Sequence, residues 1–131
     1  MKQLTLSESF TVEGKGLHSG AVISATFCQA PAGHGYKFQR IDLEGEPVID
    51  ALADYVIATN RGTVLGKGDV TVSTIEHAMA ALYAAGIDNV LIKLNGPEMP
   101  ILDGSAKPYV EAIEKAGRTE LKADKEFYVV K

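Results

Sequence analysis

Apolar and polar residues alternate in several runs along the chain, the pattern of strands with one buried face. The runs cover residues 4–12, 21–30, 36–41, 64–65, 70–72 and 89–94. Residues 48–58 are ambiguous between a strand and an irregular edge. Glycine and proline gather between the runs, above all at residues 14–20 and 95–104, and this composition is typical of turns and shaped loops.

The period changes to that of a helix at residues 73–86. Ser73 is a good N-cap, and Glu76 three residues later completes the spacing of a capping box. Gly86 is a typical left-handed stop at the other end. The sequence therefore predicts a helix with clear ends immediately after the hairpin at residues 64–72.

The surface of this helix is unusual because apolar residues surround it. With 100° per residue, one stripe carries Ile75, Ala78, Met79 and Leu82. His77 falls almost opposite, among Ala80, Ala81 and Ala84. One side can cover the sheet of this domain, so the other side needs a second partner from outside the chain.

A second helix follows residues 95–104. Ser105 is its expected cap, Pro108 is tolerated in the first turn, and Gly117 is the expected stop. The sum is an α+β fold, a two-layer sandwich of about five mostly antiparallel strands with two helices packed on one face. We expect a first domain at residues 1–120, and at 121–131 the start of a linker or the first strand of a second domain.

Composition limits the class of protein. A length of 131 residues with 46% hydrophobic residues suffices for one domain with a core. The net charge of -4 comes from 13 basic and 17 acidic residues without long runs, which argues against nucleic-acid binding. Cys28 is the only cysteine, which fits a reducing cytoplasm. Without a long apolar run, we expect neither a signal peptide nor a membrane span.

The pair Glu76-His77 is the first candidate for chemistry. A carboxylate beside a histidine ligand suits a metal-bound water that must be deprotonated. The alternative is that Glu76 only completes the capping box and His77 is a packed core histidine. The helical zinc motif HExxH is absent, because Ala81 stands where its second histidine would be.

Three other residues have a weaker case. His18, between glycines in a loop, could present an imidazole to an anionic group, or could be an exposed turn residue. His34 is most simply a solvated hairpin residue. Asp103 could orient a catalytic group or cap the second helix. Since a catalytic zinc site needs three protein ligands, this chain is not expected to complete one alone.

Four segments, in order along the chain, together resemble the N-terminal half of UDP-3-O-acyl-N-acetylglucosamine deacetylase. They are Gly16-Leu17-His18-Ser19-Gly20, Ser73-Thr74-Ile75-Glu76-His77, Gly86-Ile87-Asp88-Asn89 and Pro100-Ile101-Leu102-Asp103-Gly104-Ser105-Ala106. The resemblance implies a zinc-dependent amidase of lipid A synthesis, with two similar α+β domains whose helices pack face to face.

The resemblance also implies roles for individual residues. His77 would be one of three zinc ligands and Glu76 the general base. His18 would help with the nucleotide or phosphate end of UDP-3-O-acyl-N-acetylglucosamine, and Asp103 would support the site by hydrogen bonding. Asn60 and Arg61 would line the glucosamine and acyl-chain site.

The remaining zinc ligands of the family belong to its second half. We therefore expect this fragment to have little or no deacetylase activity without that second domain. The competing hypothesis is a non-catalytic interaction module that docks a partner through its apolar helix face. In either case we expect self-association through Ala80, Ala81 and Ala84.

Overall fold

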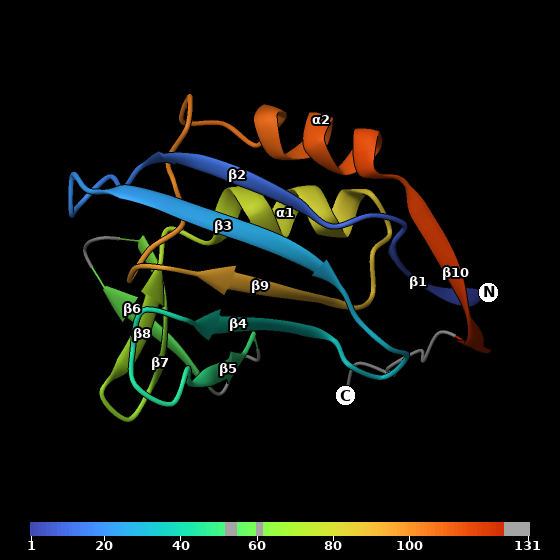
Figure 1. Ribbon diagram of the computed structural model, residues 1–131, viewed down its shortest axis with the longest axis horizontal. Helices are drawn as coiled ribbons and strands as arrows, with labels where there is room; N and C mark the ends of the chain where they lie inside the picture. Colours follow the sequence, from blue (N-terminus) through green and yellow to red (C-terminus); the bar gives the residue numbers. More distant parts are fainter. Residues whose placement is uncertain (52–54, 60–61, 125–131) are drawn as a thin grey trace.

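A five-stranded sheet forms the centre of the computed structural model, which describes residues 1–51, 55–59 and 62–124 (Figure 1). Its order is β2 (Phe10–Lys15), β3 (Val22–Gln29), β9 (Val90–Leu94), β4 (Tyr36–Arg40) and β5 (Val48–Asp50). Only β4 and β9 run parallel among these neighbours. The predicted sheet of about five mostly antiparallel strands is confirmed.

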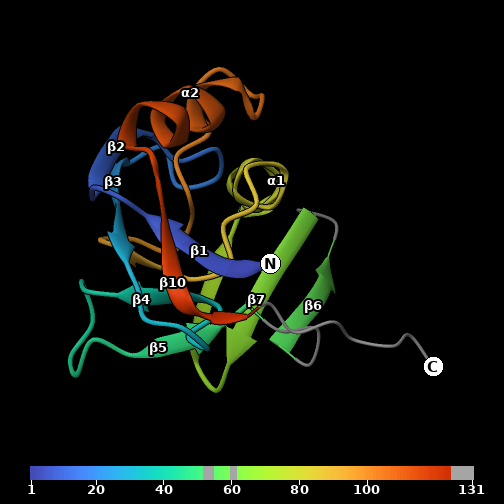
Figure 2. The ribbon, with the colours of Figure 1, turned by 90° about the vertical axis from the view of Figure 1, so that its right-hand side faces the viewer.

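Two helices lie on one side of this sheet, α1 (Glu76–Ala84) and α2 (Lys107–Ala116), as Figure 2 shows. The inward positions of β3 are buried, and Phe27 stacks on Phe10 of β2 with ring centroids 4.6 Å apart. Tyr109 of α2 packs against the same Phe27 ring. The expected α+β sandwich with two helices on one face is therefore confirmed.

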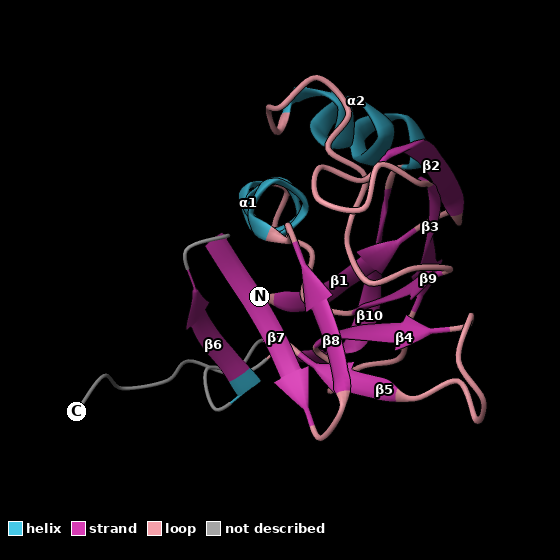
Figure 3. Ribbon diagram, turned by 90° about the vertical axis from the view of Figure 1, so that its left-hand side faces the viewer, coloured by secondary structure: helices cyan, strands magenta, loops and turns pink. Residues whose placement is uncertain are grey.

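Two smaller sheets complete the described residues, which hold ten strands in all. The predicted hairpin is present as β7 (Gly62–Lys67) and β8 (Val70–Ser73), and β6 (Val56–Thr59) pairs with β7. Figure 3 shows these three strands beside the main sheet, running across its strand direction. The ambiguous residues 48–58 thus contribute to two different sheets, as β5 and β6.

The single strand expected over residues 4–12 is wrong, because the chain changes sheet near Ser7. β1 (Lys2–Leu6) pairs antiparallel with β10 (Arg118–Asp124), and the Ser7 amide donates to the Gly117 carbonyl at 2.9 Å. β10 thus continues four residues beyond position 120 while still paired with β1. The boundary at 120 stays a prediction, and residues 125–131 lie outside the described part.

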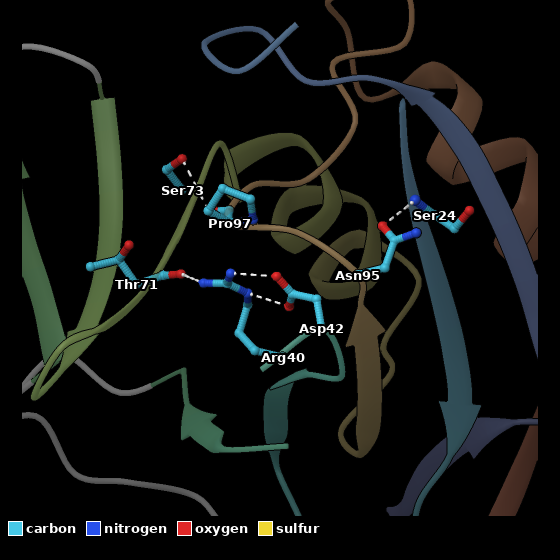
Figure 4. A network of polar contacts seen from close by, with 7 residues as sticks. All are labelled: Ser24, Arg40, Asp42, Thr71, Ser73, Asn95 and Pro97. Atoms are coloured by element: carbon cyan, nitrogen blue, oxygen red, sulfur yellow. Dashed lines mark hydrogen bonds and ion pairs between the residues drawn. The ribbon is translucent and has the colours of Figure 1, made fainter. Parts of the chain in front are cut away.

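Arg40 joins the main sheet to the three-stranded sheet (Figure 4). Its guanidinium forms two hydrogen bonds with the Asp42 carboxylate, at 2.9 and 2.8 Å, and donates to the Thr71 carbonyl of β8 at 2.8 Å. The Arg40 side chain is buried, and such a fork is the geometry that arginine uses best. These bonds fix the position of β8, and therefore of the α1 start that follows it.

The expected capping box at the start of α1 is wrong. Ser73 ends β8, where its amide donates to the Pro97 carbonyl at 2.9 Å, and Ile75 occupies the cap position without a side-chain hydrogen bond. Thr74 reverses the chain between strand and helix with a φ of 59°. Sequence spacing did not reveal this because the partner of Ser73 is more than twenty residues away.

The other helix ends agree better with the sequence. Gly86 has a φ of 75°, and the Gly86 and Ile87 amides donate to the Tyr83 and Leu82 carbonyls, which is the Schellman pattern. Gly117 ends α2 as predicted, and Pro108 lies in its first turn. The cap of α2 is Ala106 rather than Ser105, but the Ser105 hydroxyl still accepts from the Lys107 amide at 3.3 Å.

Candidate active site

Residues 97–101, here called the connecting segment, join the two parts of the chain that carry candidate chemistry. On one side the Met99 amide donates to the Ser73 carbonyl at 3.0 Å, just before α1. On the other side the Ile101 amide donates to the Lys15 carbonyl at 3.0 Å, just before the loop at residues 16–20. Backbone bridges Ser73–Glu98 and Gly16–Pro100 reinforce both contacts.

Glu98, in the middle of the connecting segment, is the functional candidate that the sequence analysis missed. Its side chain is 2% exposed, and its carboxylate accepts from the His18 amide at 3.1 Å and the Ser19 amide at 2.7 Å. Burial raises the pKa of the carboxyl, but these hydrogen bonds and the nearby imidazole lower it by more, to below the ordinary 4.5. The sequence signal that could have identified Glu98 is its single carboxylate among the apolar and proline residues of this segment.

Gly16 allows Glu98 to approach the loop so closely. A Cβ at position 16 would lie 2.5 Å from Ser19 Oγ and 2.7 Å from Glu98 Cδ. The same loop is closed by Gly20, whose amide donates to the Gly16 carbonyl at 3.0 Å. The backbone of His18 is therefore fixed while its ring stays exposed, as the sequence interpretation of a shaped loop requires.

Glu76 and His77 form the first turn of α1. Glu76 is exposed and His77 is half-buried, so His77 is not a fully packed core histidine. Because the Ser73 amide already donates to Pro97, Glu76 does not complete a capping box. The capping box therefore does not account for the position of Glu76.

Thr74, just before this turn, carries strain. It combines its positive φ with 5% exposure, and its hydroxyl has no hydrogen-bond partner among the described residues. Strain of this kind is often concentrated at functional sites. It supports a functional role for the turn that follows.

Asp103 lies in the turn before α2. Its carboxylate accepts from the Ser105 hydroxyl at 2.7 Å and from the Ser105 amide at 2.9 Å, and these bonds keep its pKa below the ordinary 3.8. These contacts stabilise the turn, which agrees with the structural alternative. Its supporting role in catalysis stays a prediction, and Asn60 and Arg61 lie outside the described residues.

A catalytic zinc ion needs three protein ligands. Within the described ranges, no group of three histidine, cysteine or acidic side chains could bind a metal. His77 can offer one ligand from a rigid helix, but the described residues do not by themselves fit the ion.

The outer face of α1 carries exposed residues that the sheet does not cover. Tyr83 is 82% exposed, and Ala80 and Ala84 are exposed beside it. Ala81 is 1% exposed, so the expectation that it belongs to this face is wrong. Its position on the helix is turned toward the core side, where α1 also contacts α2. No helix in the described part of the chain is long and apolar enough to cross a membrane.

The motif Gly86-Ile87-Asp88-Asn89 has a structural explanation. The Leu4 amide donates to Asp88 Oδ2 at 2.7 Å, which fixes β1 to the end of α1. Buried Asn89 accepts from the Gly35 amide at 2.9 Å and donates to Gln3 Oε1 at 2.9 Å. This motif therefore connects strands rather than contributing reactive groups.

Fold and site together define an α+β domain that presents a carboxylate–histidine pair at a helix start, an arrangement suited to hydrolytic chemistry. The chain belongs to the UDP-3-O-acyl N-acetylglycosamine deacetylase family, whose profile matches residues 3–131.

Two relatives illustrate the similarity. The chain is 62% identical over 131 residues to the bifunctional enzyme LpxC/FabZ of Bacteroides thetaiotaomicron. This match covers 100% of the chain and 28% of that relative. It is 49% identical over 129 residues to the UDP-3-O-acyl-N-acetylglucosamine deacetylase of Myxococcus xanthus. This match covers 98% of the chain and 41% of that relative. The chain thus spans less than half the length of either protein.

Proposed function

We propose that this chain is the N-terminal domain of a zinc-dependent deacetylase that hydrolyses the acetamide of UDP-3-O-acyl-N-acetylglucosamine in lipid A biosynthesis. The observation that carries the proposal is the Glu76–His77 pair at the start of α1, where Glu76 is exposed and His77 is half-buried. Family membership supports the same reaction.

Each site residue has a role in this proposal. His77 would hold one position of a zinc ion, and the bound ion would supply a Lewis acid for the acetamide carbonyl and for a water molecule. Glu76 takes the proton of the water that attacks the carbonyl carbon. His18 binds the nucleotide or phosphate end of the substrate, Asn60 and Arg61 line the glucosamine and acyl-chain site, and Asp103 supports the site through its turn.

A second domain of the same protein completes the site in this proposal. It supplies the other zinc ligands and packs against the outer face of α1, defined by Ala80, Tyr83 and Ala84. The 131-residue chain alone then has little or no activity. The single cysteine fits a cytoplasmic enzyme.

A chimera tests the proposal directly. Residues 1–131 replace the matching part of the Bacteroides relative, and deacetylation of UDP-3-O-acyl-N-acetylglucosamine is measured. We expect the chimera to be active and Glu76→Gln or His77→Ala to lower kcat by about a hundredfold or more. His34→Ala is the matched control, because among the described residues the His34 ring has one hydrogen-bond contact, with the neighbouring Gly35 carbonyl. Full activity of His77→Ala would contradict the proposal.

The exposed Tyr83 favours one alternative, a non-catalytic module that docks a partner through the outer face of α1. The same chimera separates the two functions. A docking module keeps its partner in His77→Ala and loses it in Tyr83→Glu. The deacetylase loses its activity in His77→Ala, with Tyr83 or with Glu at position 83.

A further inference from the structure

We propose that Glu98 is a positioning residue, which sets the place of the His18 imidazole relative to the Glu76–His77 turn by binding the His18 and Ser19 amides. This inference rests on the proposed function. It assigns a role to a residue that touches none of the reacting groups in the described structure.

The first step is that the Glu98 carboxylate binds the His18 loop. A carboxylate is seldom fully buried unless it is paired, and the Glu98 carboxylate accepts hydrogen bonds from two amides of the His18 loop. Both carboxylate oxygens are used, one for each amide. Two adjacent amides that converge on one anion fix the loop in translation and in rotation.

The second step is that the backbone of Glu98 is fixed to the other half of the site. The Ser73 amide donates to the Pro97 carbonyl at 2.9 Å, and the Met99 amide donates to the Ser73 carbonyl at 3.0 Å. The connecting segment therefore lies beside β8. Ser73 is three residues before Glu76. The connecting segment therefore joins the start of α1 to the His18 loop through hydrogen bonds on both sides.

The third step is that Gly16 is shaped for the same contact. Any side chain there would meet the Glu98 carboxyl carbon and the Ser19 hydroxyl. A loop that needed only to turn would not require Gly16 to lack a side chain, because its closing bond to Gly20 uses backbone atoms alone. Close approach of the carboxylate explains the glycine.

The anchoring is tested by NMR on the 131-residue chain. We expect the His18 and Ser19 amide protons to shift together on acidification with one apparent pKa below 4.5, since the Glu98 carboxyl is their common acceptor and His18 is the ionisable group recorded beside it. In Glu98→Gln the two amides should lose this titration and exchange with solvent faster. Amides that do not titrate in the unmodified chain would overturn the proposal even if the variant fails to fold.

Positioning through His18 is tested by a double-mutant cycle in the chimera. We expect Glu98→Gln to lower kcat/KM by about tenfold to a hundredfold, the size of effect that a misplaced group produces. In a His18→Ala background the same substitution should have almost no further effect. Equal losses in both backgrounds would overturn the proposal, because Glu98 would then act on the fold in general.

Glu13→Gln is the matched control. Glu13 is an exposed carboxylate on β2, the strand that leads into the loop, and it accepts one hydrogen bond from Ser24. It should leave both the amide titration and kcat/KM unchanged. An inactive chimera with normally titrating amides would count against the deacetylase function while supporting the anchoring by Glu98.

Discussion

At the scale of residues, the geometry of the His18 loop depends on the missing side chain of Gly16. We expect Gly16→Ala to lower the free energy of unfolding by about 1–3 kcal/mol, because the new methyl group overlaps Ser19 Oγ and the Glu98 carboxyl. Urea unfolding of the 131-residue chain measures the change. Ser19→Ala combined with Gly16→Ala should recover part of the loss, and an unchanged urea midpoint for Gly16→Ala would contradict the packing described here.

The ionised form of Glu98 should make stability depend on pH. Since its folded-state pKa is lower than the ordinary 4.5, its ionisation stabilises the fold above that value, and the contribution is lost as the pH falls through the folded-state pKa. The difference in unfolding free energy between the natural chain and Glu98→Gln should therefore be constant near neutral pH and shrink below pH 4.5. The comparison cancels Asp42 and Asp103, whose pKa values are also lowered. A difference that grows in acid would contradict the sign.

At the scale of elements, α1 depends on its C-terminal stop more than on a side-chain cap. Gly86 adopts a left-handed φ of 75°, so Gly86→Ala should cost about 1–2 kcal/mol of unfolding free energy. Gly86→Asn, which tolerates this conformation better, should cost less. Thermal unfolding followed by circular dichroism ranks the three proteins. Equal stability of the alanine and asparagine variants would argue against the Schellman geometry.

At the scale of the whole molecule, the proposed active site is divided between two domains. We therefore expect calorimetry to detect little or no zinc binding by the 131-residue chain, and no difference from His77→Ala. Tight binding of one zinc per chain that disappears in His77→Ala would mean that ligands outside the described residues, or from a second copy, complete the site.

The outer face of α1 should also affect the assembly of the isolated chain. We expect sedimentation to show self-association that grows with concentration and is reduced in Tyr83→Glu, because Tyr83 is the most exposed large side chain on this helix. Val110→Glu, at a partly exposed position on α2, is the control. A monodisperse monomer at high concentration would contradict this expectation.

Features that depend on near neighbours along the chain could be predicted from the sequence. The helical period predicted that Ile75, Ala78 and Leu82 would be buried, and they are, because residues three and four apart share one face of a helix. Gly86 and Gly117 predicted two helix ends, since a left-handed residue favours glycine wherever it occurs. The Glu76-His77 pair was recognisable for the same reason, as adjacent residues in one turn.

Pairings between distant segments became visible only in the folded chain. β1 pairs with β10 more than a hundred residues later, and Ser73 pairs with Pro97 instead of serving as a cap. Glu98 is buried against the His18 loop although eighty residues separate them in the sequence. Local spacing carries no information on such contacts, because they depend on which sheet edges and backbone donors remain available after the whole chain has folded.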